Sequence, residues 1–190
     1  MIRRVIPKDA HLIPPDATRV FKGIIFDVYQ WPQKMFDGST ATFEMLRRPD
    51  TVLILAIKDG KIVAQKEEQP YYGERLDIPG GRHDVESEDE LACAKREMKE
   101  ETGMEFASWK LVDAYQQAHK IEAFVYIFVA TDFVRQGPPQ RDAGEKISVE
   151  LMDFDDCLRR GEELGDNALC CNVLKRAGSL ENLINLPEYR

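Results

Sequence analysis

The sequence lacks the features of membrane-spanning, disulfide-stabilised and zinc-binding proteins. No apolar run approaches the roughly 20 residues that a membrane-spanning helix needs, and no long apolar run follows the two N-terminal arginines. We therefore expect neither a membrane partner nor a signal peptide. The four cysteines include the adjacent pair Cys170 and Cys171 but no Cys-x-x-Cys, and the three histidines do not join them at zinc-ligand spacing. Reduced thiols in or near the core of a cytoplasmic protein are the expectation.

Positive charge is also scarce. The chain carries 26 Lys and Arg against 34 Asp and Glu, a formal net charge of −8. Nucleic-acid-binding proteins usually present a basic face, so this balance argues against a nucleic-acid partner. It leaves a small phosphorylated substrate open, because bound metal ions can reverse the local charge. With 43% hydrophobic residues among 190, the chain can build one substantial domain.

Apolar alternation and turn residues predict a strand-rich first half. Residues 19–31 alternate as one strand, and the turn Asp37-Gly38 leads into a second strand at Thr40–Arg47. Residues 1–18 hold three prolines and are expected to form an extended or loosely ordered arm. Further strands are expected at 52–57, 61–66, 76–78, 109–117, 122–130 and 147–152.

A helix with clear start and stop signals is expected at residues 87–102. Ser87 is the expected N-cap with Glu90 as its capping-box partner, and Gly103 ends the helix. Two more helical segments are expected at 155–160 and 168–177. Strands, one helix, more strands and then two helices indicate an α/β sandwich rather than a regular doubly wound sheet.

Three glutamates of the first helix share one face. Glu97 precedes Glu100 by three residues and Glu101 by four, and side chains at these spacings are neighbours on a helix. Such like charges repel one another unless a hard cation lies among them, and Mg²⁺ takes oxygen ligands that it often shares with substrate phosphates. Because lysines and an arginine alternate with these acids, a solvated, salt-bridged helix face is the competing interpretation.

The order of residues around this face resembles the Nudix box, Gly-x5-Glu-x7-Arg-Glu-U-x-Glu-Glu-x-Gly-U, where U is aliphatic. The segment from Glu88 to Met104 matches this pattern without a gap. Six residues rather than five separate Gly81 from Glu88, and the extra one falls in the loop, where insertions are tolerated. The resemblance implies the Nudix α/β/α sandwich, with Glu88 in a structural role near the helix start.

The resemblance also implies roles in catalysis and metal binding. Glu97 and Glu101 would be the main metal ligands, and Glu100 and the Gly80 carbonyl would be further ligands. Arg96 would orient the carboxylates, so Glu101, Glu100 and Arg96 are the expected catalytic residues of the box. Mg²⁺, or Mn²⁺ in its place, would neutralise the diphosphate of the substrate and position a water.

Segments outside the box resemble the ADP-ribose pyrophosphatases and related nucleoside-diphosphate-sugar hydrolases. They are Phe36-Asp37-Gly38, Arg48-Pro49-Asp50-Thr51-Val52, Glu68-Gln69-Pro70 and Leu76-Asp77-Ile78-Pro79-Gly80-Gly81. This branch implies hydrolysis of ADP-ribose to AMP and ribose 5-phosphate, with GDP-mannose or another nucleotide sugar as the alternative substrate. A non-catalytic Nudix module that senses a nucleotide is the alternative of another class, and the complete set of box acids argues against it.

The same resemblance divides the chain and implies a homodimer. Residues 1–48 would form an N-terminal antiparallel β extension that packs across the dimer, and residues 49–190 would form the Nudix hydrolase domain. A β extension on a monomer is the alternative.

Substrate and base candidates lie outside the box. Many ADP-ribose hydrolases carry Gln-x-Arg where this chain has Gln69-Pro70-Tyr71. Arg75 or Arg82 would then meet a phosphate, since arginine suits bidentate phosphate contacts. Tyr71 or Tyr72 would stack on a base, or both would be merely structural. Tyr71 and Asp77 complete the expected substrate-binding set.

The branch also implies a further catalytic acid on the loop after the central strands. Glu145 is the candidate for the general base or for an additional metal ligand, and Glu150 is the second choice. An exposed loop acid without a catalytic role is the alternative for Glu145.

Overall fold

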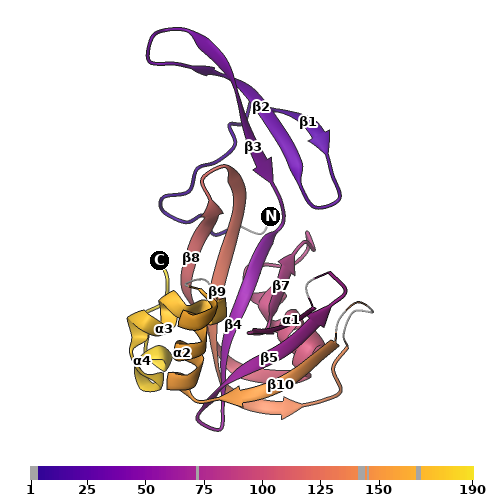
Figure 1. The fold of residues 1–190 in the computed structure, drawn as a ribbon, viewed down its shortest axis with the longest axis vertical. Coiled ribbons are helices and arrows are strands. Elements are labelled where there is room, and N and C mark those ends of the chain that lie inside the picture. The colour runs from indigo at the N-terminus through magenta and orange to yellow at the C-terminus, as the bar shows by residue number, and fades with distance from the viewer. Residues whose placement is uncertain (1–3, 72, 141–143, 145, 166–167) are drawn as a thin grey trace.

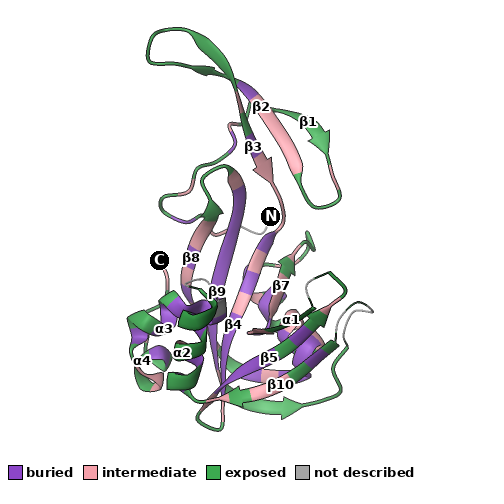
Figure 2. Cartoon of the chain, in the orientation of Figure 1, coloured by how far each residue is buried: buried purple, intermediate pink, exposed green. Residues whose placement is uncertain are grey.

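Two central strands decide the layering of the protein. In the computed structural model, which describes residues 4–71, 73–140, 144, 146–165 and 168–190, β4 (Asp50–Lys58) and β9 (Ile121–Gln136) run parallel from Thr51↔Val125 to Ala56↔Ala130. Along this pairing both strands are buried on two faces, which explains their near-continuous apolar sequences there. Figure 2 shows them as the most buried part of the sheet.

The remaining elements surround these two strands (Figure 1). They are β1 (Thr18–Lys22), β2 (Asp27–Lys34), β3 (Thr40–Arg47), β5 (Lys61–Gln69), β6 (Gly73–Asp77), β7 (Gly80–His83), α1 (Glu90–Thr102), β8 (Met104–Ala118), β10 (Lys146–Met152), α2 (Phe154–Leu164), a 3₁₀ turn (Ala168–Cys170), α3 (Cys171–Ala177) and α4 (Leu180–Ile184). The strand order is β1-β2-β3-β9-β4-β5-β10, with β6 beside β5, β7 beside β4 and β8 beside β9.

Alternate residues of β4 enter two separate hydrophobic cores. Val52, Ile54 and Ala56 pack with Cys93, Ala94 and Met98 of α1.

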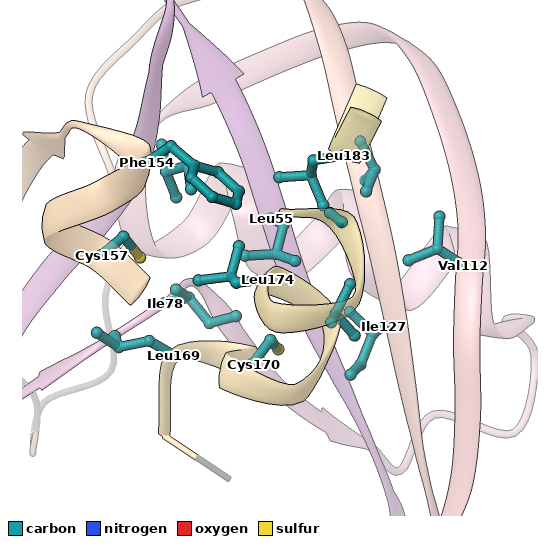
Figure 3. Packing of buried hydrophobic residues seen from close by; sticks show 14 of the residues in the cluster. Leu55, Ile78, Val112, Ile127, Phe154, Cys157, Leu169, Cys170, Leu174 and Leu183 are labelled. Carbon is teal, nitrogen blue, oxygen red and sulfur yellow. The ribbon is translucent and has the colours of Figure 1, made fainter. Parts of the chain in front are cut away.

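Leu55 and Ile57 face the other way, and Figure 3 shows Leu55 among residues of the C-terminal helices, including Leu174 and Leu183. Helices therefore cover both faces of the sheet, and the expected α/β/α sandwich is confirmed. The four cysteines are all buried, as expected. None of the helices in the described ranges is long and apolar enough to cross a membrane.

The first three strands form an antiparallel extension that projects from the body (Figure 1). It joins the body sheet through a short parallel pairing of β3 with β9, at Leu46↔Ile121 and Arg47↔Glu122. The single strand expected at 19–31 was wrong, because the chain turns between β1 and β2. There Gly23 N–H donates to the Phe26 carbonyl at 3.0 Å, a turn that alternation alone does not reveal.

Two further elements were not expected. β7 follows Pro79 and begins with a glycine pair typical of a loop, yet it pairs with β4 from Asp50↔His83 to Leu53↔Gly80. α4 is a short helix that starts at the cap Ser179 and buries Leu183 in the core beneath the C-terminal helices.

Candidate active site

The acidic helix α1 starts later than expected. Its N-cap is Asp89, whose carboxylate accepts the Ala92 N–H at 2.7 Å, so the assignment of Ser87 was wrong. Ser87 lies within the preceding turn, where Glu88 N–H reaches the Val85 carbonyl. Glu90 is not a capping-box partner either, because its buried carboxylate accepts a hydrogen bond from outside the helix.

The end of α1 follows the expectation. Gly103 adopts a left-handed conformation with φ 73°, and its N–H donates to the Lys99 carbonyl at 2.9 Å. The segment after β9 donates hydrogen bonds to two more carbonyls at this end of the helix. Gly137 N–H donates to Gly103 O and Gln140 N–H to Glu100 O, each at 2.8 Å. The start of the loop after β9 is therefore hydrogen-bonded to the C-terminal end of the acidic helix.

Two glutamates of α1 lie against the glycine pair of β7. Glu101 is 6% exposed, and its Oε2 accepts the Gly80 N–H at 2.9 Å. The Glu97 carboxylate lies so close to Gly81 that a Cβ on that residue would be 2.3 Å from Oε2. Gly81 therefore leaves the space that brings the Glu97 carboxylate beside the backbone of β7.

One guanidinium links three carboxylates beside this contact. Arg96 Nη2 lies 2.7 Å from Glu88 Oε1, while its Nη1 lies 2.7 Å from Glu97 Oε1 and 3.0 Å from Glu100 Oε2. Hydrogen bonds from Arg96 lower the pKa of the Glu88 carboxyl, so this acid stays ionised. Arg96 thus lies among three carboxylates, and the roles that the resemblance implies for Arg96 and Glu88 stay predictions.

The donor chemistry of this face fits a hard divalent cation. Glu97, Glu100 and Glu101 offer carboxylate oxygens within about one turn of α1. Glu97 and Glu101 lie close to the Gly80-Gly81 backbone. Arg96 holds the carboxylates of Glu97 and Glu100. Across the described ranges, no three acidic, His or Cys side chains surround one point closely enough to hold a metal ion.

The base candidates have different outcomes. Glu145 lies outside the described residues. Glu150 sits opposite Ala64 in the β10–β5 pairing and forms an ion pair with Lys66 at 2.7 Å. Its neighbour Val149 packs in the core on the α1 side, so alternation points Glu150 away from α1.

Two of the expected substrate residues lie on β6, and one of them, Arg75, lies between the buried acid Glu67 of β5 and the other, Asp77. Arg75 Nη2 lies 2.9 Å from Glu67 Oε2, and its Nε lies 3.4 Å from Asp77 Oδ2. Burial raises the pKa of the Asp77 carboxyl, against a hydrogen bond from its neighbour's N–H and the charge of Arg75. Val63 packs on the α1 side, so strand alternation places Glu67 and its partner Arg75 on that face too.

The other two expected substrate residues are more exposed. The Arg82 side chain is 52% exposed and lies 3.9 Å from Asp84, while its carbonyl accepts a hydrogen bond from Arg96 Nη2 at 3.4 Å. Tyr71 is 87% exposed in the turn between β5 and β6. The structure thus brings only the backbone of Arg82 to the acidic helix, because Gly81 faces Glu97 and strand alternation points the Arg82 side chain the other way. Tyr71 stays at the surface, and Tyr72 lies outside the described residues.

Glu67 was missed by the sequence reasoning. The strand expected at 61–66 stopped one residue short of it, whereas β5 continues to Gln69. Extending the alternation of Val63 by two further steps would have placed Glu67 facing inward.

Comparison with known proteins agrees with this architecture. The family model of the NUDIX domain matches residues 46–170. An ADP-ribose pyrophosphatase of Bacillus subtilis (strain 168) is 27% identical over 145 residues, which cover 74% of this chain and 78% of that protein. An ADP-ribose pyrophosphatase of Mycobacterium tuberculosis (strain ATCC 25618 / H37Rv) is 31% identical over 121 residues, which cover 62% of this chain and 58% of that protein.

A solved structure of an ADP compounds hydrolase has the same fold. It superposes with a TM-score of 0.66 at 18% identity and covers 85% of this chain and 90% of that one. The structural likeness extends beyond the region that matches the family model, because 85% of this chain is more than residues 46–170 account for. Because the family model covers well over half of the sequence, and the fold and acidic helix agree with it, this chain belongs to the Nudix domain family.

Proposed function

We propose that this Nudix pyrophosphohydrolase cleaves the pyrophosphate bond of ADP-ribose, releasing AMP and ribose 5-phosphate. The observation that carries the proposal is the packing of Glu97 and Glu101 against Gly80-Gly81. It occurs in a chain with two curated relatives that are ADP-ribose pyrophosphatases. The diphosphate of such a substrate explains the acidic face, because a bound cation can join carboxylates to phosphate oxygens.

The reaction requires the developing charge on the diphosphate to be stabilised. Glu97, Glu100, Glu101 and the Gly80 carbonyl would hold Mg²⁺, or Mn²⁺ in its place. When bound, the ion supplies Lewis-acid stabilisation of phosphate oxygens and lowers the pKa of a coordinated water.

The chain's own residues orient the acids and hold the substrate. Arg96 keeps the carboxylates of Glu97 and Glu100 on one side of α1 through bonds of 2.7 and 3.0 Å. Arg82 stays the candidate for a phosphate oxygen, with a half-exposed guanidinium on the residue after Gly81 and a backbone carbonyl that accepts a hydrogen bond from Arg96. Asp77 and Arg75 extend the polar surface along β6 for the sugar or phosphate, and Tyr71 would reach the base from its exposed turn.

An attacking water must also lose a proton. Glu145 stays our candidate for the base that accepts this proton. It follows Gln140 in the sequence, and the Gln140 N–H donates a hydrogen bond to the Glu100 carbonyl. Glu150 is disfavoured for this role because it pairs with Lys66 on the far face of the sheet.

The test is a panel of ADP-ribose, GDP-mannose and other nucleotide sugars with Mg²⁺ or Mn²⁺, followed by chromatographic product analysis. We expect ADP-ribose to have the highest kcat/KM and AMP to be released. Glu101→Gln should lower kcat by at least about a hundredfold, because an electrostatic contact at the reacting centre contributes that much. The control Glu86→Gln changes an exposed acid just before the helix and should keep full activity.

Each outcome of the panel decides between the candidates. Preference for GDP-mannose or another nucleotide sugar would replace ADP-ribose as the substrate while keeping the chemistry. A folded protein that binds a nucleotide but turns over nothing in the panel would be the sensing module instead.

We also infer that residues 1–48 mediate a homodimer. The end of β1 and the turn that follows it expose apolar side chains, with Phe21 at 59% and Ile24 at 103%. Residues 21–26 line an open apolar hollow of about 620 Å³. Phe36, in the next turn, is 113% exposed. Monomeric proteins rarely expose apolar groups gathered in this way, and Figure 2 shows how little of the extension is buried.

Light scattering coupled to size-exclusion chromatography tests the dimer. We expect twice the chain mass of 21.8 kDa for the wild type and a single-chain mass for Phe21→Asp/Ile24→Asp. The control Leu164→Asp places an aspartate on another exposed apolar residue, at the end of α2, and should leave the mass doubled. A wild type that stays monomeric at micromolar concentration contradicts the inference.

A further inference from the structure

The N-terminal arm, residues 4–17, is bonded to the body of the protein, where its composition predicted an extended or loosely ordered segment. Figure 1 shows it passing the turn between β8 and β9 before the chain enters β1. There His11 N–H donates to Gln116 Oε1 at 2.7 Å, and Gln116 Nε2 donates back to the His11 carbonyl at 2.9 Å. Ile13 is 7% exposed and packs with Trp31 in the middle of β2.

Three carboxylates that take no part in the acidic face are buried under this arm. Asp50, Glu90 and Glu122 are 6%, 6% and 3% exposed, and they lie at the starts of β4, α1 and β9. A buried carboxylate is unfavourable unless hydrogen-bond donors or a cation surround it. Each of the three takes at least one such donor from the arm.

Consecutive residues of the arm connect two of these acids. Arg4 binds both oxygens of Asp50, with Nε–Oδ2 at 2.6 Å and Nη2–Oδ1 at 2.5 Å. Val5 N–H donates to Glu90 Oε1 at 2.8 Å, and the Val5 carbonyl accepts from Tyr126 Oη at 2.7 Å. Burial raises the pKa of the Tyr126 phenol, which keeps it a neutral donor. The arm thus links the start of β4 to the first residue of α1.

The third acid, Glu122, adds contacts from the arm to β3 and β9. Glu122 Oε2 accepts the Ile13 N–H at 2.5 Å, and its Oε1 lies 2.7 Å from Arg47 Nη2 and 3.4 Å from Arg4 Nη1. One buried carboxylate therefore joins both ends of the arm to β3 and β9.

We propose that the arm positions the acidic helix, with Arg4 and Glu90 as positioning residues for the reaction. Glu90 precedes Glu97 by seven residues, which at 1.5 Å per residue is about 10 Å along the axis. Holding the first turn of α1 on the central strands keeps Glu97 and Glu101 at the glycine pair of β7. Asp89 caps the helix from within, whereas the Val5–Glu90 bond ties the helix to another part of the chain.

A matched pair of substitutions at Glu90 tests this role. Glu90→Ala removes the acceptor for Val5 N–H, whereas Glu90→Gln keeps an oxygen at that position. Arg4→Ala tests the link from the arm, where no residue of α1 is altered. Lys8→Ala is the control, because Lys8 is an exposed residue of the same arm.

Two measurements separate positioning from general stability. The first is kcat and KM for ADP-ribose, which rests on the proposed function. The second is hydrogen exchange of the α1 amides, which does not. In Glu90→Ala and Arg4→Ala we expect kcat to fall between about tenfold and a hundredfold, as for a displacement near 1 Å at a reacting centre. KM should change less than about twofold, and faster exchange should be confined to the first turns of α1.

The two control variants should behave like the wild type. Glu90→Gln and Lys8→Ala should keep the wild-type kcat and the wild-type exchange in α1. Folded Glu90→Ala or Arg4→Ala with unchanged kcat and exchange would overturn the proposal. Faster exchange spread evenly over β4, β9 and α1 would overturn it too, because the arm would then act only on global stability. If the wild type does not hydrolyse ADP-ribose, the proposed function fails, and the exchange pattern still decides whether the arm positions α1.

Discussion

Adding one methyl group at Gly81 should lower activity with little effect on stability. A Cβ at this position would lie 2.3 Å from both Cδ and Oε2 of Glu97 and 2.6 Å from Oε1. An ordinary contact begins at 3.4 Å, so the carboxylate must retreat by about 1 Å. Gly81 has no positive φ, so alanine fits the backbone without strain. The clash therefore falls on the end of one flexible side chain.

The magnitude follows from that displacement. A shift of about 1 Å at a reacting centre lowers the rate by roughly a hundredfold, or about 2.7 kcal/mol in the activation free energy. We expect Gly81→Ala to lower kcat for ADP-ribose between tenfold and about a hundredfold. Moving the Glu97 carboxylate disturbs its 2.7 Å contact with Arg96 and leaves the backbone of β7 and α1 in place, so Tm should fall by less than about 3 °C.

The neighbouring glycine supplies the control, because its clash is with the backbone. A Cβ at Gly80 would lie 2.2 Å from the Val52 carbonyl oxygen and 3.1 Å from Leu53 Cα, both on the paired strand β4. A central strand cannot retreat, so Gly80→Ala should cost about 2–3 kcal/mol and lower Tm by about 5–10 °C.

AMP release and circular-dichroism melting measure the two effects. The reasoning is refuted if Gly81→Ala keeps kcat within twofold of the wild type, or if it loses as much Tm as Gly80→Ala.

Two further predictions concern the ends of the acidic helix. Gly103→Ala forces a side chain onto φ 73° and places its Cβ 2.0 Å from the Gly137 carbonyl oxygen, so calorimetry should show Tm lower by at least about 5 °C; an unchanged Tm would contradict the contact. Glu88→Gln removes the acid whose pKa Arg96 lowers. A lowered pKa adds stability above the ordinary value near 4.3 and loses it as pH falls through the folded value. Wild type should therefore exceed Glu88→Gln in Tm by about 2–6 °C at pH 7, and the gap should close towards pH 3; a gap independent of pH would contradict this.

The fold class and the family were predictable because their signals are local. The Nudix box depends on residue spacings along one helix, and a helix converts those spacings directly into a shared face. Apolar runs buried on both faces marked β4 and the middle of β9 for the same reason. The roles assigned to individual residues of the site stay predictions, and Glu145 lies outside the described residues.

The errors share a different cause. Ser87 and Asp89 both suit an N-cap, and the choice between them depends on where Glu90 points. Glu90 turns inward to meet Val5, a residue 85 positions earlier in the chain. Likewise, Gly80-Gly81 resembles a loop in isolation and becomes a strand only because β4 offers it partners.

By itself, the sequence determined the acidic face of α1, because the positions of Glu97, Glu100 and Glu101 follow from helix geometry once a helix forms. Only the tertiary structure decided what that face meets. The glycine pair of β7 receives its carboxylates, and buried acids under the N-terminal arm hold its first turn. The physical reason is that a buried charge must find donors, and these come from segments far away in the sequence.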